Sequence, residues 1–301
     1  MTTRFVSSVA MPEKKIPMIF DLFSLTKPRL SSLVIFTSAL GMFLAPGNIS
    51  FWKALISIFA TSGLVGGACV INCWMEKDID ALMERTKSRP LPSGRLNPAI
   101  ALGLGLILIS VCLSTLFFIT NPLTAALGLT ATVTYVFLYT PMKKKTSWAL
   151  FAGAIPGAIP PLMGWTAVTD SIGALGMVLF AILFVWQLPH FLSISMYHAR
   201  DYNKADFKIF PTQIGTRNTI HKIAIYTFIL FLTSLIPYYM GEASSYYRNF
   251  VFVLGGAFFI LALLGYQQEE NSDALLAWAR RYFYASLIYL PCVFVAMIFF
   301  K

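Results

Sequence analysis

A cluster of polar and charged residues, NCWMEKDIDALMERTKSRPL at positions 72–91, directly follows a long, almost wholly apolar segment. If this segment continues as a helix, Asn72, Glu76 and Asp80 are four residues apart and lie within about 80° on one face. Asp78 points to nearly the opposite side. One amide and two carboxylates on one face form an oxygen-ligand set for Mg²⁺, which usually also binds substrate phosphates. The alternative interpretation is a helix end that is merely solvated.

Basic residues follow the acidic ones closely, with Arg85, Lys87 and Arg89 a short distance after Asp80. Arginine presents a planar, bidentate group to phosphate, and lysine presents a compact point charge. Together with carboxylates and a divalent cation, such side chains can hold a diphosphate and stabilise its departure. Residues that served only as topological anchors would explain the number of bases, but not their interleaving with acids.

A second charged segment, HARDYNKADFKIFP at positions 198–211, repeats this mixture of acids and bases. Its carboxylates, Asp201 and Asp206, are five residues apart and therefore about 140° apart around a regular helix. Both can face one metal ion only if the helix is broken or bulged there. Asp201 is the better candidate ligand, and Asp206 is either a second ligand or a solvated charge.

His190 follows the helix-perturbing Pro189 and is predicted to lie at membrane depth. Ionisable residues inside a membrane are costly and commonly functional. His190 could ligate heme iron or carry protons, and the alternative is a hydrogen bond to a neighbouring helix. Cys69 and Cys73 are one helical turn apart, but no further thiol or histidine is near in the sequence. We therefore expect them to be packing residues rather than ligands of a soft metal.

The composition indicates which elements position these residues. Of the 301 residues, 57% are hydrophobic and only 12% are charged, against roughly 25% charged residues in soluble domains. A helix needs about twenty apolar residues to cross the hydrocarbon core of a bilayer. We expect an all-α polytopic membrane protein with nine transmembrane helices in one bundle, at about 29–46, 51–72, 98–118, 122–140, 147–168, 172–195, 222–240, 248–267 and 282–300. The run at 147–168 is the weakest, because Pro156, Pro160 and Pro161 interrupt it.

The charge distribution predicts the orientation of these helices. With nine spans and a cytoplasmic N-terminus, all 23 Lys and Arg residues except Lys53, Arg248 and Lys301 lie on the cytoplasmic side. This positive-inside pattern places the C-terminus outside, and it explains the net charge of +10 without nucleic acid as a partner. All 13 acidic residues except Asp170 and Glu242 lie on the same side. Topology rules do not require this acidic enrichment, so we expect a function for the carboxylates.

We expect a cytoplasmic segment at 1–28 and a single membrane domain at 29–301. Residues 1–28 have neither the apolar stretch of a signal peptide nor the Arg-rich composition of a mitochondrial transit peptide, so a bacterial inner membrane is the expected location.

A lysine triplet lies in the segment YTPMKKKTSW, at positions 139–148, which is expected on the cytoplasmic side together with both acidic segments. Lys144 and Lys145 belong to this triplet. A lysine triplet in a tight turn is commonly an anchor, and a contact of Lys144 or Lys145 with phosphate is the alternative.

The polar motifs resemble those of a known family. NCWMEKDID followed by MERTKSRPL is similar to the N-x-x-x-D-x-x-x-D motif of the intramembrane aromatic prenyltransferases, the UbiA superfamily. One branch of that superfamily, whose members farnesylate heme, has further similar segments, here LTKPRL at 25–30, YTPMKKKT at 139–146, GAIPPLMGW at 157–165, Pro189-His190-Phe191 and Asp201-Tyr202. The resemblance covers nearly the whole chain, and the nine-helix bundle of the superfamily agrees with the count of apolar runs.

The resemblance implies a central cavity that opens near the cytoplasmic face, and transfer of the farnesyl group of farnesyl diphosphate to a vinyl group of heme b, giving heme O and diphosphate. Mg²⁺ would bridge the diphosphate and the carboxylates. The implied metal and catalytic ligands are Asn72, Glu76, Asp80 and Asp201, with Asp206 as a further metal ligand. The implied diphosphate contacts are Arg85, Lys87, Arg89 and Lys145. Heme A synthase or the assembly of a terminal oxidase is an implied partner.

Two positions depart from the family pattern. Glu76 stands where the superfamily usually has Asp, and Ala205 stands where its second motif, D-x-x-x-D, has the second carboxylate. The rival interpretations are a prenyltransferase for another acceptor, such as a quinone precursor or chlorophyllide, and a membrane transporter whose acids bind ions. A transporter is expected to have its site near the membrane midplane, whereas the charges of this chain gather at one face.

Overall fold

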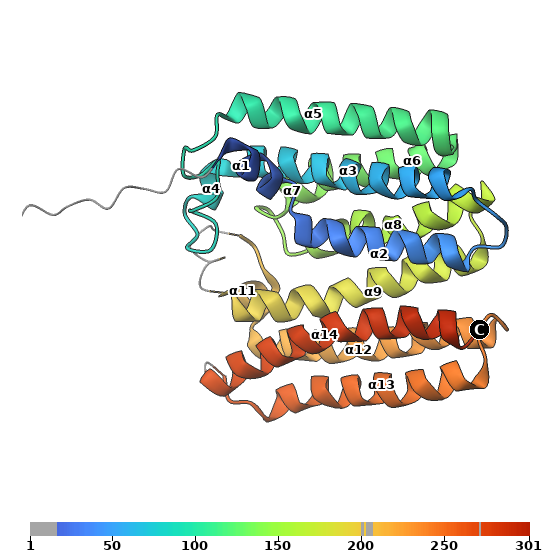
Figure 1. Cartoon of the computed structure of the whole chain (residues 1–301). Coiled ribbons are helices and arrows are strands. Elements are labelled where there is room, and N and C mark those ends of the chain that lie inside the picture. Colours follow the sequence, from blue (N-terminus) through green and yellow to red (C-terminus); the bar gives the residue numbers. More distant parts are fainter. Residues whose placement is uncertain (1–16, 200–201, 203–206, 271) are drawn as a thin grey trace, which may run out of the picture.

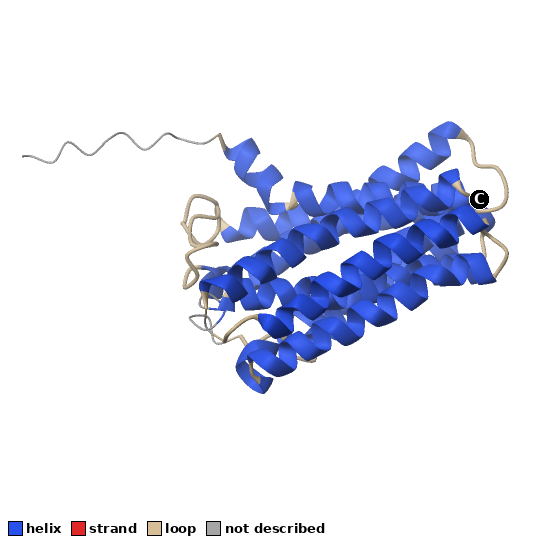
Figure 2. Ribbon diagram, turned by 90° about the horizontal axis from the view of Figure 1, so that it is seen from below, coloured by secondary structure: helices blue, strands red, loops and turns tan. Residues whose placement is uncertain are grey.

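The computed structural model describes residues 17–199, 202, 207–270 and 272–301, and this part of the chain contains helices and no strand. The long helices run side by side along one axis, so that their ends gather at two opposite ends of a bundle (Figure 1 and Figure 2). The short helices α4 (Lys77–Asp80) and α11 (Phe210–Ile214) lie at one of these ends, which we call the α4 end. The C-terminus lies at the other.

Helices occupy all nine predicted ranges within the described residues. A short helix that the sequence did not predict, α1 (Met18–Leu25), precedes them. The long helical segments are α2 (Pro28–Leu44), α3 (Phe51–Met75), α5 (Pro98–Thr115) with η1 (Leu116–Thr120), α6 (Pro122–Val133) with η2 (Thr134–Tyr139) and α7 (Thr140–Met142), α8 (Ala149–Thr169), α9 (Ala174–Tyr197), α12 (Thr216–Tyr239), α13 (Ser245–Leu263) with η3 (Leu264–Gln267), and α14 (Asp273–Phe299).

Seven of these described segments are long and apolar enough to cross a membrane. The chain is therefore a multi-pass membrane protein. Of the two remaining segments, α2 has only 17 residues, and α8, which contains Pro156, Pro160 and Pro161, is not one of the seven. The predicted count of nine spans thus stays a prediction for α2 and α8.

Asparagine–proline pairs determine where two of the long helices begin. The Oδ1 atom of Asn97 accepts a hydrogen bond from the backbone N–H of Ala99 at 2.8 Å, and Pro98 is the first residue of α5. Asn121 caps α6 in the same way, ahead of Pro122. An asparagine cap satisfies a free N–H of the first turn, and proline has no N–H there to satisfy. The starts of these helices are consequently encoded locally.

Helices α2 and α8 approach each other closely because glycine lies at their interface. A Cβ atom on Gly164 of α8 would overlap the carbonyl oxygen of Ser38 of α2, and one on Gly41 of α2 would overlap the carbonyl oxygen of Pro161. In a membrane the hydrophobic effect does not drive helices together. Small residues instead let two backbones approach closely, and the resulting van der Waals contact stabilises the helix pair. This contact holds the α2 side of the bundle against α8.

We predict that Gly164→Ala lowers the thermal unfolding midpoint of the purified protein, because the new methyl group meets backbone of α2 that cannot easily move. The expected decrease in the free energy of unfolding is about 1–3 kcal/mol, as for other overpacked positions. Gly103→Ala is the matched control, since a Cβ there has no atom within 4 Å. Equal midpoints for the two variants in the same detergent would contradict the close contact.

Candidate active site

The predicted acidic face lies at the junction of α3 and α4. Helix α3 ends at Met75, and Glu76 has a non-helical backbone (φ −102°, ψ 5°) before α4 begins at Lys77. The helix thus continues past Asn72, as the sequence analysis supposed, but it is interrupted at one residue, Glu76. Hydrogen bonds from Glu76 N to Asn72 O (3.0 Å) and from Asp80 N to Glu76 O (2.8 Å) nevertheless preserve the four-residue step across the break.

Because that step is preserved, the three side chains still face the protein interior together. Asn72, Glu76 and Asp80 are 2%, 5% and 3% exposed. The side chain of Asp78 is 84% exposed and pairs with Lys77 at 3.1 Å. The sequence-based separation of Asp78 from the other three is confirmed.

Asn72 is held by residues from two other parts of the chain. Its Oδ1 atom accepts hydrogen bonds from Lys27 Nζ at 2.9 Å and Tyr135 Oη at 3.4 Å, and its Nδ2 atom donates to Thr140 Oγ1 at 3.1 Å. Lys27 caps α2 with a left-handed backbone (φ 52°), which is unusual for a residue other than glycine. Such strain is retained where the surrounding structure requires it, and here it accompanies the approach of the ammonium to Asn72.

Glu76 forms a buried ion pair with Lys143, which follows α7. The Lys143 Nζ atom lies 2.7 Å from Oε1 and 2.9 Å from Oε2 of Glu76, and it donates a hydrogen bond to Oε2. Oε1 is within ion-pair distance but has no hydrogen bond of good geometry among the described residues. The same ammonium lies 4.8 Å from the centre of the Tyr139 ring and 5.5 Å from that of Phe207. Both oxygens of Glu76 are therefore occupied by one ammonium, which donates its well-aligned hydrogen bond to Oε2.

Asp80 is bound by the loop that follows it. Arg89 Nη1 donates to Asp80 Oδ2 at 2.8 Å, and the Thr86 hydroxyl donates to the Asp80 carbonyl at 2.7 Å. The loop is fixed in turn to α1, because Arg95 donates to both carboxylate oxygens of the buried Asp21. These contacts hold the basic segment 85–95 over the acidic face.

The other predicted diphosphate contacts are exposed. Lys87 pairs with Glu84 on the surface, and Arg85 and Lys145 are also exposed. Arg85 lies near the Tyr202 hydroxyl, whose pKa burial raises and the Arg85 guanidinium lowers in part. The roles of Arg85, Lys87 and Lys145 toward diphosphate stay predictions.

The carboxylates of the second acidic segment, Asp201 and Asp206, lie outside the described residues. Within the part that the structure describes, no group of three His, Cys, Asp or Glu side chains lies close enough to hold a metal ion. The described oxygen donors at the first acidic segment are Asn72, Glu76 and Asp80. One amide and two buried carboxylates are donor types that fit Mg²⁺, which accepts one or two carboxylates together with substrate oxygens.

His190 is 6% exposed and lies on α9. Its Nδ1 atom lies 2.7 Å from the hydroxyl of Ser286 on α14. This is the interhelical hydrogen bond that the sequence offered as the alternative to a functional role. It leaves Nε2 available, so ligation of heme iron by His190 stays a prediction.

Sequence reasoning missed two of the residues that contact the acidic face. Lys143 belongs to the lysine triplet that the sequence singled out, but Lys144 and Lys145 were preferred over it. Lys27 lies in the segment LTKPRL, which entered only as part of the family resemblance. Its position directly before Pro28, at a predicted helix start, was the available signal.

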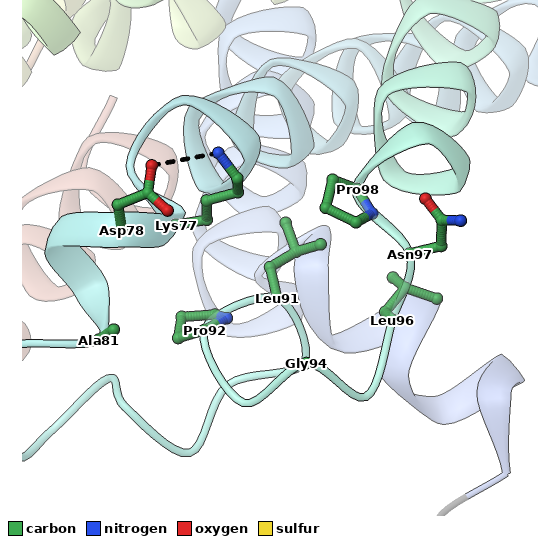
Figure 3. A pocket seen from close by; sticks show the side chains of 9 residues that line it. All are labelled: Lys77, Asp78, Ala81, Leu91, Pro92, Gly94, Leu96, Asn97 and Pro98. Atoms are coloured by element: carbon green, nitrogen blue, oxygen red, sulfur yellow. Dashed lines mark hydrogen bonds and ion pairs between the residues drawn. The ribbon is translucent and has the colours of Figure 1, made fainter.

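A shallow pocket of about 430 Å³ lies outside the acidic face, between α4 and the start of α5 (Figure 3). Lys77 and Asp78 line one side with their ion pair, and Leu91, Leu96 and Pro98 line the other. None of the predicted metal ligands lines it, because α4 turns Asp78 outward while Glu76 and Asp80 are buried. The pocket is therefore distinct from the candidate active site.

Comparison with known proteins agrees with this architecture. Residues 34–288 match the UbiA prenyltransferase family. A protoheme IX farnesyltransferase of Anaeromyxobacter sp. (strain Fw109-5) is 47% identical over 277 residues, which are 92% of each chain. The protoheme IX farnesyltransferase of Myxococcus xanthus (strain DK1622) is 44% identical over 92% of this chain and 93% of its own.

Two solved structures are similar in fold at low sequence identity. A structure described for digeranylgeranylglyceryl phosphate synthase aligns with a TM-score of 0.78 at 16% identity, over 94% of this chain and 98% of its own. A UbiA homologue from Archaeoglobus fulgidus, bound to GPP and Mg²⁺, aligns with a TM-score of 0.67 at 14% identity, over 92% and 99%. The matched residues and the shared helical fold together establish that the chain belongs to the UbiA prenyltransferase family.

Proposed function

We propose that this chain transfers the farnesyl group of farnesyl diphosphate to a vinyl group of heme b, to which the hydroxyl group of a water molecule also adds, giving heme O and releasing diphosphate. The observation that carries the proposal is the similarity, over 92% of the chain, to several relatives named protoheme IX farnesyltransferase. These names favour heme over a quinone precursor or chlorophyllide as acceptor. Family membership favours an enzyme over a transporter.

The acidic face is the proposed diphosphate end of the reaction. Asn72, Glu76 and Asp80 would hold Mg²⁺ together with diphosphate oxygens, and Asp201, with Asp206 as an alternative, would complete the ligand set. The relative from Archaeoglobus fulgidus that was solved with GPP and Mg²⁺ supports the choice of metal. When bound, Mg²⁺ neutralises charge on the diphosphate and so favours breakage of the allylic C–O bond.

The basic residues at the site can bind either the polar side chains of the acidic face or the diphosphate of the substrate. Without substrate, Lys27, Lys143 and Arg89 contact Asn72, Glu76 and Asp80 respectively. When a diphosphate arrives, these ammonium and guanidinium groups can donate to its oxygens, as can Arg85, Lys87 and Lys145 at the edge. Donors already aimed at the place where negative charge develops stabilise the leaving group without further rearrangement.

The proposed function also includes a position and an orientation of the chain in the membrane. The chain would form one membrane domain at 29–301 with nine spans in a bacterial inner membrane, its N-terminus in the cytoplasm and its C-terminus outside. Its central cavity would open near the cytoplasmic face, where the acidic segment ends α3. An association with heme A synthase or a terminal oxidase stays a prediction.

The direct test uses the full chain in lipid nanodiscs with heme b, farnesyl diphosphate and Mg²⁺. We expect mass spectrometry to detect heme that has gained one farnesyl group and one hydroxyl group, while the remaining proton of the added water leaves with one released diphosphate. Absence of this product, together with farnesylation of a quinone precursor or chlorophyllide under the same conditions, would show that the acceptor is wrong.

We predict that Asp80→Asn lowers kcat/KM for farnesyl diphosphate by at least about a hundredfold, a typical cost of removing one charge-stabilising group. The Mg²⁺ concentration needed for half-maximal activity should rise as well. Asp78→Asn is the matched control, because it makes the same change on the exposed side of α4. Similar kinetics for both variants would exclude Asp80 as a ligand of the metal or diphosphate.

We predict that Lys143→Met lowers the free energy of unfolding by about 3–5 kcal/mol, because it leaves the Glu76 carboxylate buried without its cation. Adding Glu76→Gln should restore much of this stability but none of the activity. Lys77→Met is the control, since its exposed pair with Asp78 is worth at most about 1 kcal/mol. A double variant no more stable than Lys143→Met alone would argue against the buried pair.

A further inference from the structure

Helix α1 has an outer face of large apolar side chains that the fold leaves exposed. These side chains are between 57% and 68% exposed: Met18, Ile19, Phe20 and Phe23. The opposite face is buried and carries Asp21 and Leu25, which are one helical turn apart. An exposed apolar patch on a folded protein commonly marks contact with lipid or with another protein. A segment expected in the cytoplasm therefore has a surface that suits a different environment.

The contact of α1 with α3 determines its depth in the bundle. Thr26, directly after α1, packs against α3, because a Cβ atom on Gly66 would lie 3.2 Å from Thr26 Cβ. Gly66 is nine residues before the end of α3 at Met75, which is about 14 Å along the helix. Helix α3 is one of the seven described segments that can cross a membrane. The C-terminal end of α1 consequently lies within the length of a membrane-crossing helix, rather than beyond it.

The inner face of α1 packs beside a helix that faces lipid. Leu22 and Leu25 share one apolar cluster with Ala101 and Leu104, which lie on the first two turns of α5. Helix α5 forms one edge of the bundle (Figure 1), and only 17% of its apolar stretch is buried inside the protein. The outer face of α1 therefore borders a surface that lipid covers. This favours the lipid headgroup region, where helices with one apolar face bind, over a protein partner.

The buried face of α1 is connected to the basic segment 85–95. Asp21 accepts hydrogen bonds from Arg95 Nε at 3.3 Å and from Arg95 Nη2 at 3.1 Å. The third guanidinium nitrogen, Nη1, donates to the carbonyl of Ser88 at 2.9 Å. Ser88 directly precedes Arg89, whose guanidinium donates to Asp80 at 2.8 Å. One arginine thus joins α1 to the backbone next to a cation of the acidic face.

Helix α1 also reaches the acidic face through the residues that follow it. Only Thr26 separates α1 from Lys27, whose ammonium donates to Asn72 Oδ1 at 2.9 Å. The position of α1 therefore affects two cations at the acidic face, Lys27 through the chain and Arg89 through the contact of Asp21 with Arg95.

We propose that α1 binds the lipid headgroup region through its exposed apolar face, and that Asp21 is a positioning residue for the acidic face. Helix α1, held by lipid, fixes Arg95 and thereby the basic segment that carries Arg89. The effect on catalysis rests on the proposed function. The lipid contact and the connection between α1 and the basic segment do not.

Photocrosslinking of the full chain tests the lipid contact. The chain carries benzoylphenylalanine in place of Phe23 and is reconstituted in vesicles of phosphatidylethanolamine and phosphatidylglycerol. We expect mass spectrometry to detect phospholipid attached at this position. The same label in place of Asp78, whose side chain is 84% exposed on α4, should give no such adduct. Crosslinking to a second copy of the chain instead of lipid, or equal lipid adducts at both positions, would overturn the proposed partner.

Hydrogen–deuterium exchange in the same vesicles tests the connection. Phe20→Ser combined with Phe23→Ser should speed amide exchange at least tenfold in residues 17–25 and also in 85–95. The matched control is Phe117→Ser combined with Phe118→Ser, because these exposed phenylalanines lie on η1 at the opposite end of the bundle. Exchange in both segments should then be unchanged.

Asp21→Asn separates the two parts of the proposal. It should speed exchange about tenfold in 85–95 but not in 17–25, because the apolar face of α1 is intact. Asp21→Glu should restore the slow exchange. Unchanged exchange in 85–95 for both Asp21→Asn and the double phenylalanine variant would disprove the connection.

Kinetics with farnesyl diphosphate test the positioning role. Asp21→Asn should raise KM about tenfold with a smaller change in kcat, since Arg89 is held less firmly where the diphosphate binds, and Asp21→Glu should recover most of the affinity. A wild-type chain that makes no heme O would disprove the proposed function, while the exchange results would still decide the connection. Normal kinetics of Asp21→Asn in a chain that makes heme O would disprove the positioning role alone.

Discussion

Pairing of buried carboxylates with cations is the constraint on which the α4 end of the bundle depends. Glu76 and Asp80 are nearly inaccessible to solvent, and an uncompensated charge in such a place costs several kcal/mol. Lys143 and Arg89 provide the compensation, and Lys27 donates a hydrogen bond to the neutral amide of Asn72. Because these three cations come from the start of α2, the end of α7 and the loop after α4, the polar pairs also join those elements.

The same pairs determine what the site can do chemically. A carboxylate that is matched by a cation costs little while no substrate is present, and its partner is already within reach of an incoming anion. The two carboxylate oxygens of Glu76 lie 2.7 Å and 2.9 Å from the Lys143 ammonium, and a metal ion would have to share this carboxylate with that lysine. The arrangement thus combines a stable resting state with groups that can be redirected toward a diphosphate and its metal.

Much of the fold could be predicted from sequence, because hydrophobic length is a property of each segment by itself. All nine helical ranges and the common face of Asn72, Glu76 and Asp80 followed from composition and helical spacing. The break at Glu76 did not, since a one-residue interruption leaves the four-residue step unchanged. Neither did the choice of Lys143 over its neighbours, or the role of Lys27. These depend on which distant segment folds against α3, and periodicity carries no such information.

The left-handed backbone of Lys27 has a consequence for attempts to stabilise this protein. A lysine in that conformation costs about 1–3 kcal/mol, and glycine would adopt it without strain. A laboratory selection for heat resistance alone should therefore favour glycine at position 27, and with it would remove the ammonium that contacts Asn72. Thermostability and the integrity of the polar site are opposed at this one residue, so directed evolution of the chain needs a screen for both.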